Sequence, residues 1–459
     1  MPEEREVAVS GQAADHRQIA VYAAPALRPA LTVSLLLVSA LLLYAANRAA
    51  HEGVNRGWFV AVSLAGLFVV RGLHLCRPIT LPHVAAAVLM LACANLAYRA
   101  EHSLAGFVFL AGTGFVLMLP HASRPHPAHR YRIAELVGRT ERDPLAAFAL
   151  HSAKSYFFDA ADSAALAYRT RFGIAVVSGD PIGDRAAFGS LLGEFSVFAA
   201  ENGWRIAVLG SSPEMVELWR LRAGEHRGLR AVPIGRDVVI EVGDFAMVGR
   251  DFRNLRQAVN RTGNFGVTTE IMLESALTEP LRAELLDIVD QWRVGRQSRG
   301  FSMILDHLLD GCHPGMLLVL ARDAQGRVAG FQRYGIAARG TELSLDVPWR
   351  RKDAPNGLDE RMIVDLVDYA RGSGITRISL AFAPFPELFA DKDRSRTGRL
   401  IYVLAHLGDP LIRLESLYRF LRKFHSMAER RYVLIRWWEA LPAVAALLTL
   451  EFVPHRKQY

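Results

Sequence analysis

The chain has 459 residues, of which 51% are hydrophobic and 22% are charged, and its formal net charge is +8. This composition excludes a disordered chain, and it is more apolar than that of an average soluble domain. A basic, arginine-rich chain is compatible with RNA or anionic lipid as partners. Three cysteines without a paired motif favour a reducing compartment.

Four apolar segments follow one another in the N-terminal quarter of the chain, at residues 30–46, 58–70, 81–98 and 103–120. Each approaches the roughly 20 apolar residues that cross a bilayer, and the loops between them are short. Core helices of a soluble domain are the less favoured alternative. We therefore predict a tail over 1–29 and an all-α transmembrane region of about four helices over 30–120.

Arginines predict how this region is oriented. They gather in the N-terminal tail, around Arg71 and Arg77, and after the fourth segment, whereas few lie on the other side. The positive-inside rule then places the tail and the large C-terminal part in the cytoplasm, on a multi-pass protein of the cell (plasma) membrane. A basic linker over 121–133 is expected to lie against anionic headgroups, and the irregular spacing of its histidines does not predict a metal site.

From residue 134, apolar runs at strand and helix spacing alternate. The pattern predicts strands at the end of 164–178, over 204–209 and over 237–241, with helices over 185–202 and 213–223. A similar succession follows, with a helix over 279–294, a hairpin over 316–337, a strand over 341–347, a helix over 357–372, a strand over 377–381 and a helix over 411–424. The two successions predict an α/β cytoplasmic part of two related halves, 134–275 and 276–459.

The C-terminal region carries a basic stretch and then an apolar one. Residues 418–432 combine five Arg and Lys with aromatic residues, which favours a basic helix that faces RNA or membrane. Residues 433–453 are apolar but are interrupted by Arg436, Glu439 and Pro442. We expect an interfacial or packed helix there in preference to a fifth membrane span.

Basic residues at helical spacing also mark residues 250–261, which read RDFRNLRQAVNR. No acidic residue from 252 to 266 is available to neutralise these arginines. This favours a face that binds the phosphates of RNA or lipid, and a solvated amphipathic helix is the alternative. The turn GDPIG at 179–183 follows an apolar strand, so it is either a simple turn or a part of a site.

A third cluster of cations, Arg350 to Lys352, stands between Asp346 and Asp353. It is either a loop with local salt bridges or a phosphate clamp at the start of the helix near 357. The sequence shows no metal site, no P-loop, no dinucleotide fingerprint and no hydrolase nucleophile elbow.

Nine motifs in one order resemble the catalytic domain of the phosphatidylglycerol lysyltransferase family, the multiple peptide resistance factors. The resemblance spans about residues 140–450. The motifs are KSYFF (154–158), VVSGDPIG (176–183), GW (203–204), FRNLRQAVNR (252–261), QWR to RGFSM (291–303), GRVAGF (326–331), SLD to APNGL (344–358), SLAFAPF (379–385) and YRFLRKF to RRY (418–432).

The resemblance implies a membrane region followed by two acetyltransferase-like (GNAT) folds. It implies transfer of an amino acid, with lysine among the candidates, from aminoacyl-tRNA to a hydroxyl of phosphatidylglycerol, which alters membrane surface charge and antibiotic resistance. No cofactor is implied. The alternatives are a GNAT-like acyltransferase that uses acyl-CoA or a different lipid or peptide acceptor, and a non-enzymatic membrane protein that binds lipid or RNA.

By the same resemblance, Asp346, Arg350 and Arg351 match an acidic residue followed by a double arginine, with Trp349 at a position where the family has arginine. Asp346 is expected to be the catalytic base or an orienting group, and Glu360 is a second catalytic candidate. Lys423 and Phe424 match a C-terminal Lys-Phe pair without the Pro and Trp that follow it in the family. The expected substrate contacts are Asp180, Arg253, Arg256, Asn260, Arg261, Arg350, Arg351, Asn356 and Lys423.

Overall fold

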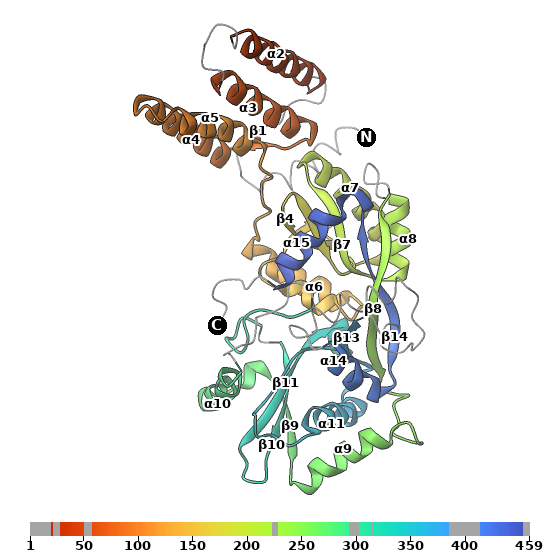
Figure 1. The fold of residues 1–459 in the computed structure, drawn as a ribbon. Coiled ribbons are helices and arrows are strands. Elements are labelled where there is room, and N and C mark those ends of the chain that lie inside the picture. Colours follow the sequence, from red (N-terminus) through yellow and green to blue (C-terminus); the bar gives the residue numbers. More distant parts are fainter. Residues whose placement is uncertain are drawn as a thin grey trace.

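A computed structural model describes residues 20–21, 28–49, 57–222, 228–292, 303–313, 315–384 and 414–452. A group of N-terminal helices stands at one end of a larger α/β domain (Figure 1). These helices are α2 (Arg28–Ala49), α3 (Gly57–His74), α4 (Leu81–Arg99) and α5 (Ser103–Met118). Two short strands, β1 (Ala20–Val21) and β2 (Ile79–Thr80), pair beside them.

Two of the four helices, α3 and α4, are long and apolar enough to cross a membrane. The apolar part of α2, Pro29–Leu42, and all of α5 are shorter. Large apolar side chains point away from the protein on these helices, and Leu41 and Leu104 are 66% and 76% exposed. An apolar surface of this kind suits contact with lipid. Among the described residues, two of the four predicted segments therefore combine the length and the apolar composition of a membrane span.

The helices meet closely and also touch the domain. A Cβ atom on Gly114 of α5 would come 2.2 Å from the carbonyl oxygen of Ala65 in α3, so only glycine fits at this crossing. On the domain side, Trp204 Nε1 donates to the carbonyl of His121 at 3.1 Å, and Gly203 lies against the loop after α3. That loop and the segment after α5 thus both lie against the domain, in keeping with the predicted orientation.

One sheet of twelve strands runs through the domain. Pairing is antiparallel between neighbours except for β5 with β7 and β12 with β13, which are parallel. In spatial order the strands are β3 (Ser155–Phe158), β4 (Ala164–Arg171), β5 (Ile174–Ser178), β7 (Arg205–Ser211), β14 (Met427–Ile435), β8 (Arg230–Glu241), β13 (Arg377–Pro384), β12 (Glu342–Arg350), β11 (Val328–Ala337), β10 (Leu317–Arg322) and β9 (Thr268–Leu273), with β6 (Ile182–Gly183) beside β4.

The order of elements repeats within this sheet. Three antiparallel strands, β3 to β5, are followed by α7 (Phe188–Glu201) and the parallel strand β7. Strands β10 to β12 are likewise followed by α11 (Leu358–Ser373) and the parallel strand β13. After each parallel strand the chain crosses over: α8 (Pro213–Arg222) leads to β8, which pairs with β13, and α14 (Leu414–Leu421) leads to β14, which pairs with β7. The two halves therefore exchange their last strands.

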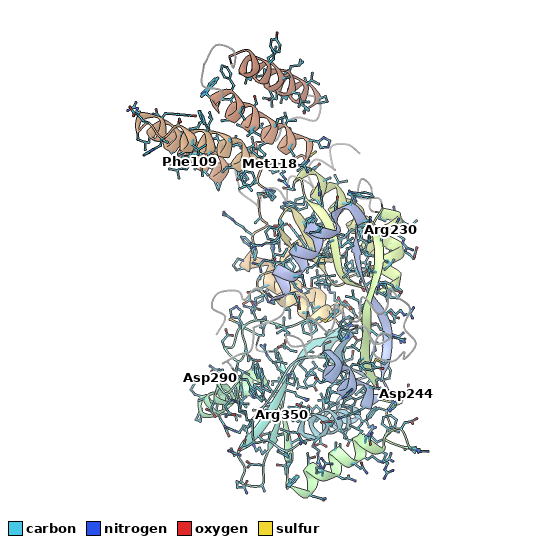
Figure 2. The ribbon with its side chains drawn as sticks, viewed as in Figure 1. Phe109, Met118, Arg230, Asp244, Asp290 and Arg350 are labelled. Atoms are coloured by element: carbon cyan, nitrogen blue, oxygen red, sulfur yellow. The ribbon has the colours of Figure 1, made fainter. Side chains whose placement is uncertain are left out.

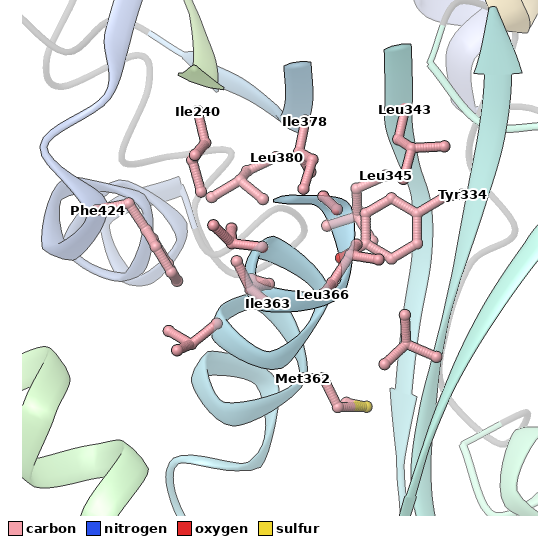
Figure 3. Close-up of a cluster of buried hydrophobic side chains, with 14 of the residues drawn as sticks. Ile240, Tyr334, Leu343, Leu345, Met362, Ile363, Leu366, Ile378, Leu380 and Phe424 are labelled. Carbon is pink, nitrogen blue, oxygen red and sulfur yellow. The ribbon is translucent and has the colours of Figure 1, made fainter. Parts of the chain in front are cut away.

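Each half has its own apolar core. In the first, α7 and α8 bury Phe195 and Trp219 against the sheet. In the second, Figure 3 shows Met362, Ile363 and Leu366 of α11 facing side chains of the sheet. The domain also contains the helices α6 (Arg130–Arg139), α9 (Arg253–Asn264) and α10 (Glu279–Asp290).

The C-terminal region corrects one prediction and refines another. Residues 418–432 are not one basic helix: α14 ends at Leu421, a short 3-10 turn spans Arg422–Phe424, and β14 begins at Met427. His425 has a left-handed backbone (φ 53°), which interrupts the helix. Further on, α15 (Ala440–Phe452) packs Ala443 and Ala446 against β5, as expected for a packed helix.

Candidate active site

Arg333 of β11 and Asp346 of β12 form a fully buried ion pair at the centre of the second half. Arg333 Nη1 donates to Asp346 Oδ2 at 3.0 Å, and Arg333 Nε donates to Glu274 Oε2 at 2.7 Å. The backbone N–H of Leu305 donates to the other oxygen of Asp346 at 2.7 Å. Burial raises the pKa of Asp346 to about 6, although the charge of Arg333 opposes this rise.

A loop over residues 303–313 covers this pair. The carbonyl of His307 accepts a hydrogen bond from Arg333 Nη2 at 3.1 Å. The neighbouring Asp306 is bound by the backbone N–H of Ser152 at 3.1 Å and lies 3.3 Å from His313 Nε2. Burial alone would raise the pKa of Asp306, but the hydrogen bonds from His313 and Ser152 and the nearby His151 hold it well below its usual range. The loop is thus anchored to both halves of the domain.

The two expected catalytic carboxylates do not share a site. Leu343 and Leu345 of β12 pack under α11, so strand alternation places Asp346 on the opposite face of the sheet. Glu360 lies in the first turn of α11 and accepts a hydrogen bond from Lys423 Nζ at 2.6 Å. The structure therefore brings together Glu360 and Lys423, and it separates both from Asp346.

Helix α9 presents the predicted basic face. Leu255 and Val259 are buried beneath it, whereas Arg253, Asn260 and Arg261 are exposed. Arg256 is half-buried and donates to the carbonyl of Met247 at 2.7 Å. In Figure 1, α9 lies at the end of the domain opposite to α2–α5. The exposed arginines are thus remote from the N-terminal helices.

Of the double arginine, Arg351, which directly follows β12, points toward α10. Arg351 Nη1 pairs with Asp287 at 2.7 Å, and Arg351 Nε donates to the carbonyl of Val328. The carbonyl of Arg350 accepts a hydrogen bond from Trp292 Nε1 at 2.6 Å. In Figure 2, Arg350 and Asp290 of α10 both lie in the part of the domain that is far from Met118 of α5. Arg351 is therefore already engaged in protein contacts, and the half-buried Arg350 lies beside it.

Asn356 and Gly357 form the turn that precedes α11. Gly357 has φ +102°, and a Cβ atom there would come 2.8 Å from the carbonyl oxygen of Ala258 in α9. The turn thus abuts α9, and Asn356 is exposed next to it. Of the predicted substrate contacts, Asn356 and the α9 residues form one continuous region.

Asp180 lies in a second buried polar cluster, built around Arg431 of β14. Arg431 contacts Asp180, Asp143 and Asp237 at 3.0, 2.9 and 2.7 Å, and the backbone N–H of Ser212 binds the other oxygen of Asp180. Arg431 is 2% exposed. In this structure Asp180 therefore joins the C-terminal strand to the first half.

Comparison with known protein families identifies the family to which this chain belongs. Residues 134–435 match the family described as "Phosphatidylglycerol lysyltransferase, C-terminal". The chain belongs to this family. The match covers both halves and the exchanged strand β14, so the Asp346 and Arg431 clusters both lie within the lysyltransferase domain.

Known relatives cover the chain to different extents. The "MprF-like domain protein Rv1619" of Mycobacterium tuberculosis is 49% identical over 402 residues, covering 87% of this chain and 83% of that protein. The "Lysylphosphatidylglycerol biosynthesis bifunctional protein LysX" of Rhodococcus jostii is 32% identical over 280 residues, covering 60% of this chain. The chain spans only 25% of the length of that protein.

A solved structure shares the fold of the lysyltransferase domain. The structure of L-PGS from Bacillus licheniformis has a TM-score of 0.61 at 21% identity and covers 72% of this chain and 97% of that chain. The mixed α/β architecture of the domain is therefore one already known in solved structures.

Several buried residues of the lysyltransferase domain were not predicted from sequence. Arg333 and Glu274 were missed, although an arginine inside the apolar strand GFQRYGIA is a signal of a buried charge. Lys154, in the motif KSYFF, is also buried, and it donates to the carbonyl of Phe148 and to Ser178 Oγ. Burial lowers the pKa of Lys154 to about 7.

Proposed function

We propose that the chain transfers an amino acid from aminoacyl-tRNA to a hydroxyl of a membrane phospholipid, with phosphatidylglycerol as the acceptor and lysine as the first candidate amino acid. The observation that carries this proposal is the lysyltransferase family domain attached directly to helices with an outward apolar surface. Aminoacyl-tRNA then reaches the domain from the cytoplasm, and the phospholipid reaches it from the adjacent membrane leaflet.

The reaction is an ester exchange. The lipid hydroxyl oxygen forms a bond to the aminoacyl carbonyl carbon, the bond from that carbon to the tRNA ribose oxygen breaks, and one proton moves from the lipid to the tRNA. Such a step needs positioning and a group that accepts a proton, and it needs no redox change. We assign Asp346 to accepting this proton or orienting the aminoacyl end, because its pKa of about 6 suits a base near neutral pH.

The basic face of α9 is assigned to the phosphates of tRNA. Its arginines lie at the end of the domain remote from α2–α5, which favours a polyanion from the cytoplasm over the lipid headgroup. The exposed Arg250 and Arg422 extend this face, because His425 contacts Phe252 and the carbonyl of Asp251 at the start of α9.

The architecture assigned to this function includes two GNAT-like halves, 134–275 and 276–459, in the cytoplasm below a membrane region of about four helices. The repeated strand–helix–strand order supports two related halves. The exchanged strand β14 and the helix α15 belong in sequence to the second half, but they pack on the first.

The proposal is tested with purified chain, aminoacyl-tRNA charged with a labelled amino acid, and vesicles that contain phosphatidylglycerol. Labelled lipid should form, and ribonuclease treatment of the tRNA should abolish it. Asp346→Asn should reduce the initial rate by about 100-fold or more. Asp368→Asn, at an exposed aspartate on α11, is the matched control and should keep the rate.

Other outcomes favour the alternatives. Transfer from acyl-CoA that continues after ribonuclease treatment would indicate an acyltransferase of a different donor class. Binding of tRNA and vesicles without turnover, for any charged amino acid, would indicate a binding protein.

A further inference from the structure

The loop over residues 303–313 carries a second cluster with its own chemistry. We propose that His307, Asp310 and Cys312 bind one divalent metal ion of the zinc class. One ligand atom from each residue lies within 4.8 Å of the other two. The sequence alone predicted no metal site, because the three residues match no standard ligand spacing.

The geometry fits a small tetrahedral ion. Zinc bonds to nitrogen and carboxylate oxygen are about 2.0–2.2 Å and zinc bonds to thiolate are about 2.3 Å, so neighbouring ligand atoms lie about 3.3 to 3.8 Å apart. His307 Nδ1 and Asp310 Oδ2 are 2.6 Å apart, so they need to separate by less than about 1 Å to bind an ion. Water takes the fourth position.

A carboxylate behind the histidine supports the same assignment. When Nδ1 of His307 binds the metal, Nε2 carries the proton, and it faces Asp306 Oδ2 at 3.7 Å. Asp306 is itself fixed by Ser152 and His313. Histidine ligands of metals commonly donate their second N–H to such a carboxylate, which fixes the ring orientation.

The backbone places the other two ligands side by side. The N–H of Cys312 donates to Asp310 Oδ1 at 2.9 Å, which leaves Oδ2 facing His307. The donor set of one nitrogen, one oxygen and one sulfur favours zinc or cobalt over magnesium or calcium, which bind oxygen. On binding, the Cys312 thiol releases its proton to solvent.

The site would stabilise the loop that covers Asp346. Leu305 N–H and the His307 carbonyl bind Asp346 and Arg333 directly, so a metal ion on His307, Asp310 and Cys312 fixes the same loop from its outer side. This role is structural, and it does not depend on which substrates the domain uses.

The test uses the full chain in detergent, stripped with a chelator and titrated with Co²⁺. We expect one ion per chain and a thiolate-to-cobalt charge-transfer band, both removed by adding Zn²⁺ in excess. Cys312→Ser should abolish the band and weaken binding by at least about tenfold. Cys93→Ser, at a free cysteine in α4, is the matched control and should keep both.

Two further variants separate ligation from loss of folding. Asp310→Asn keeps an oxygen for the Cys312 N–H but loses the charge, and His307→Ala removes the nitrogen ligand. Both should weaken Co²⁺ binding while the thermal unfolding temperature of the metal-free chain stays within a few degrees of that of the unmodified chain. The absence of a charge-transfer band in the unmodified chain, or metal binding that survives Cys312→Ser, would overturn the proposal.

Discussion

Asp346 is the residue on which the proposed chemistry depends most. Its pKa is raised from 3.8 to about 6 because burial disfavours the charged form. The folded state therefore binds its proton more tightly than the unfolded state, so its contribution to stability decreases as the pH rises from about 4 to about 6. The carboxylate form, which alone can accept a proton, is formed as the pH rises through about 6.

The pH dependence of the reaction follows. We expect initial rates of lipid aminoacylation to rise with pH through about 6 and to level off near neutral pH. The residual rate of Asp346→Asn should lack this rise. If the rate of the variant rises with pH in the same way, another group is responsible for the pH dependence.

Arg431 supports the fold at a distance from Asp346. Replacing it by Met leaves Asp143, Asp180 and Asp237 buried around an apolar side chain. We expect a loss of about 3–5 kcal/mol in unfolding free energy, read as a lower thermal unfolding temperature. Arg430→Met, at the exposed neighbour on β14, should change the unfolding temperature little. Equal effects of the two variants would contradict the account.

At the scale of elements, α9 provides the proposed tRNA contact. Replacing Arg253 and Arg261 by Ala should weaken tRNA binding and reduce the slope of log affinity against log salt by about 1.5. Binding to vesicles of anionic lipid should not change. Arg185→Ala with Arg220→Ala, two exposed arginines of the first half, is the control pair. A loss of vesicle binding with unchanged tRNA binding would assign α9 to lipid.

The packing of α9 on α11 depends on Gly357. An alanine there would be strained at φ +102° and would press against the Ala258 carbonyl. We expect Gly357→Ala to destabilise the chain by about 1 kcal/mol or more. Gly372→Ala, inside α11 with no atom within 4 Å of the new Cβ, should stabilise it by about 0.5–1 kcal/mol. The thermal unfolding temperatures of both variants, measured in detergent, test these predictions: the temperature should fall for Gly357→Ala and rise for Gly372→Ala.

Local periodicity predicted most elements and their order. The prediction of one helix over 418–432, made from basic residues interleaved with aromatic ones, was wrong. Part of this stretch is a strand, in which Arg431 is buried against three carboxylates far away in the sequence. The pairs of Arg333 with Glu274 and of Lys423 with Glu360 were not predicted for the same reason. Such contacts depend on which strands become neighbours, and no local pattern encodes that.

At the scale of the whole molecule, the exchange of β8 and β14 makes the halves interdependent. Strand β14 separates β7 from β8 and supplies Arg431 to the first half. Removing residues 427–459 should therefore prevent folding of both halves, seen as loss of cooperative thermal unfolding. A truncated chain that unfolds like the complete one would contradict this arrangement.

The central claim joins the lysyltransferase domain to the membrane beside it. Mass spectrometry of lipids from cells with and without the chain tests it most directly. The account predicts a new lipid whose mass exceeds that of phosphatidylglycerol by one aminoacyl group, and its absence when Asp346→Asn replaces the unmodified chain. Identical lipid profiles with and without the folded chain in the membrane would contradict it.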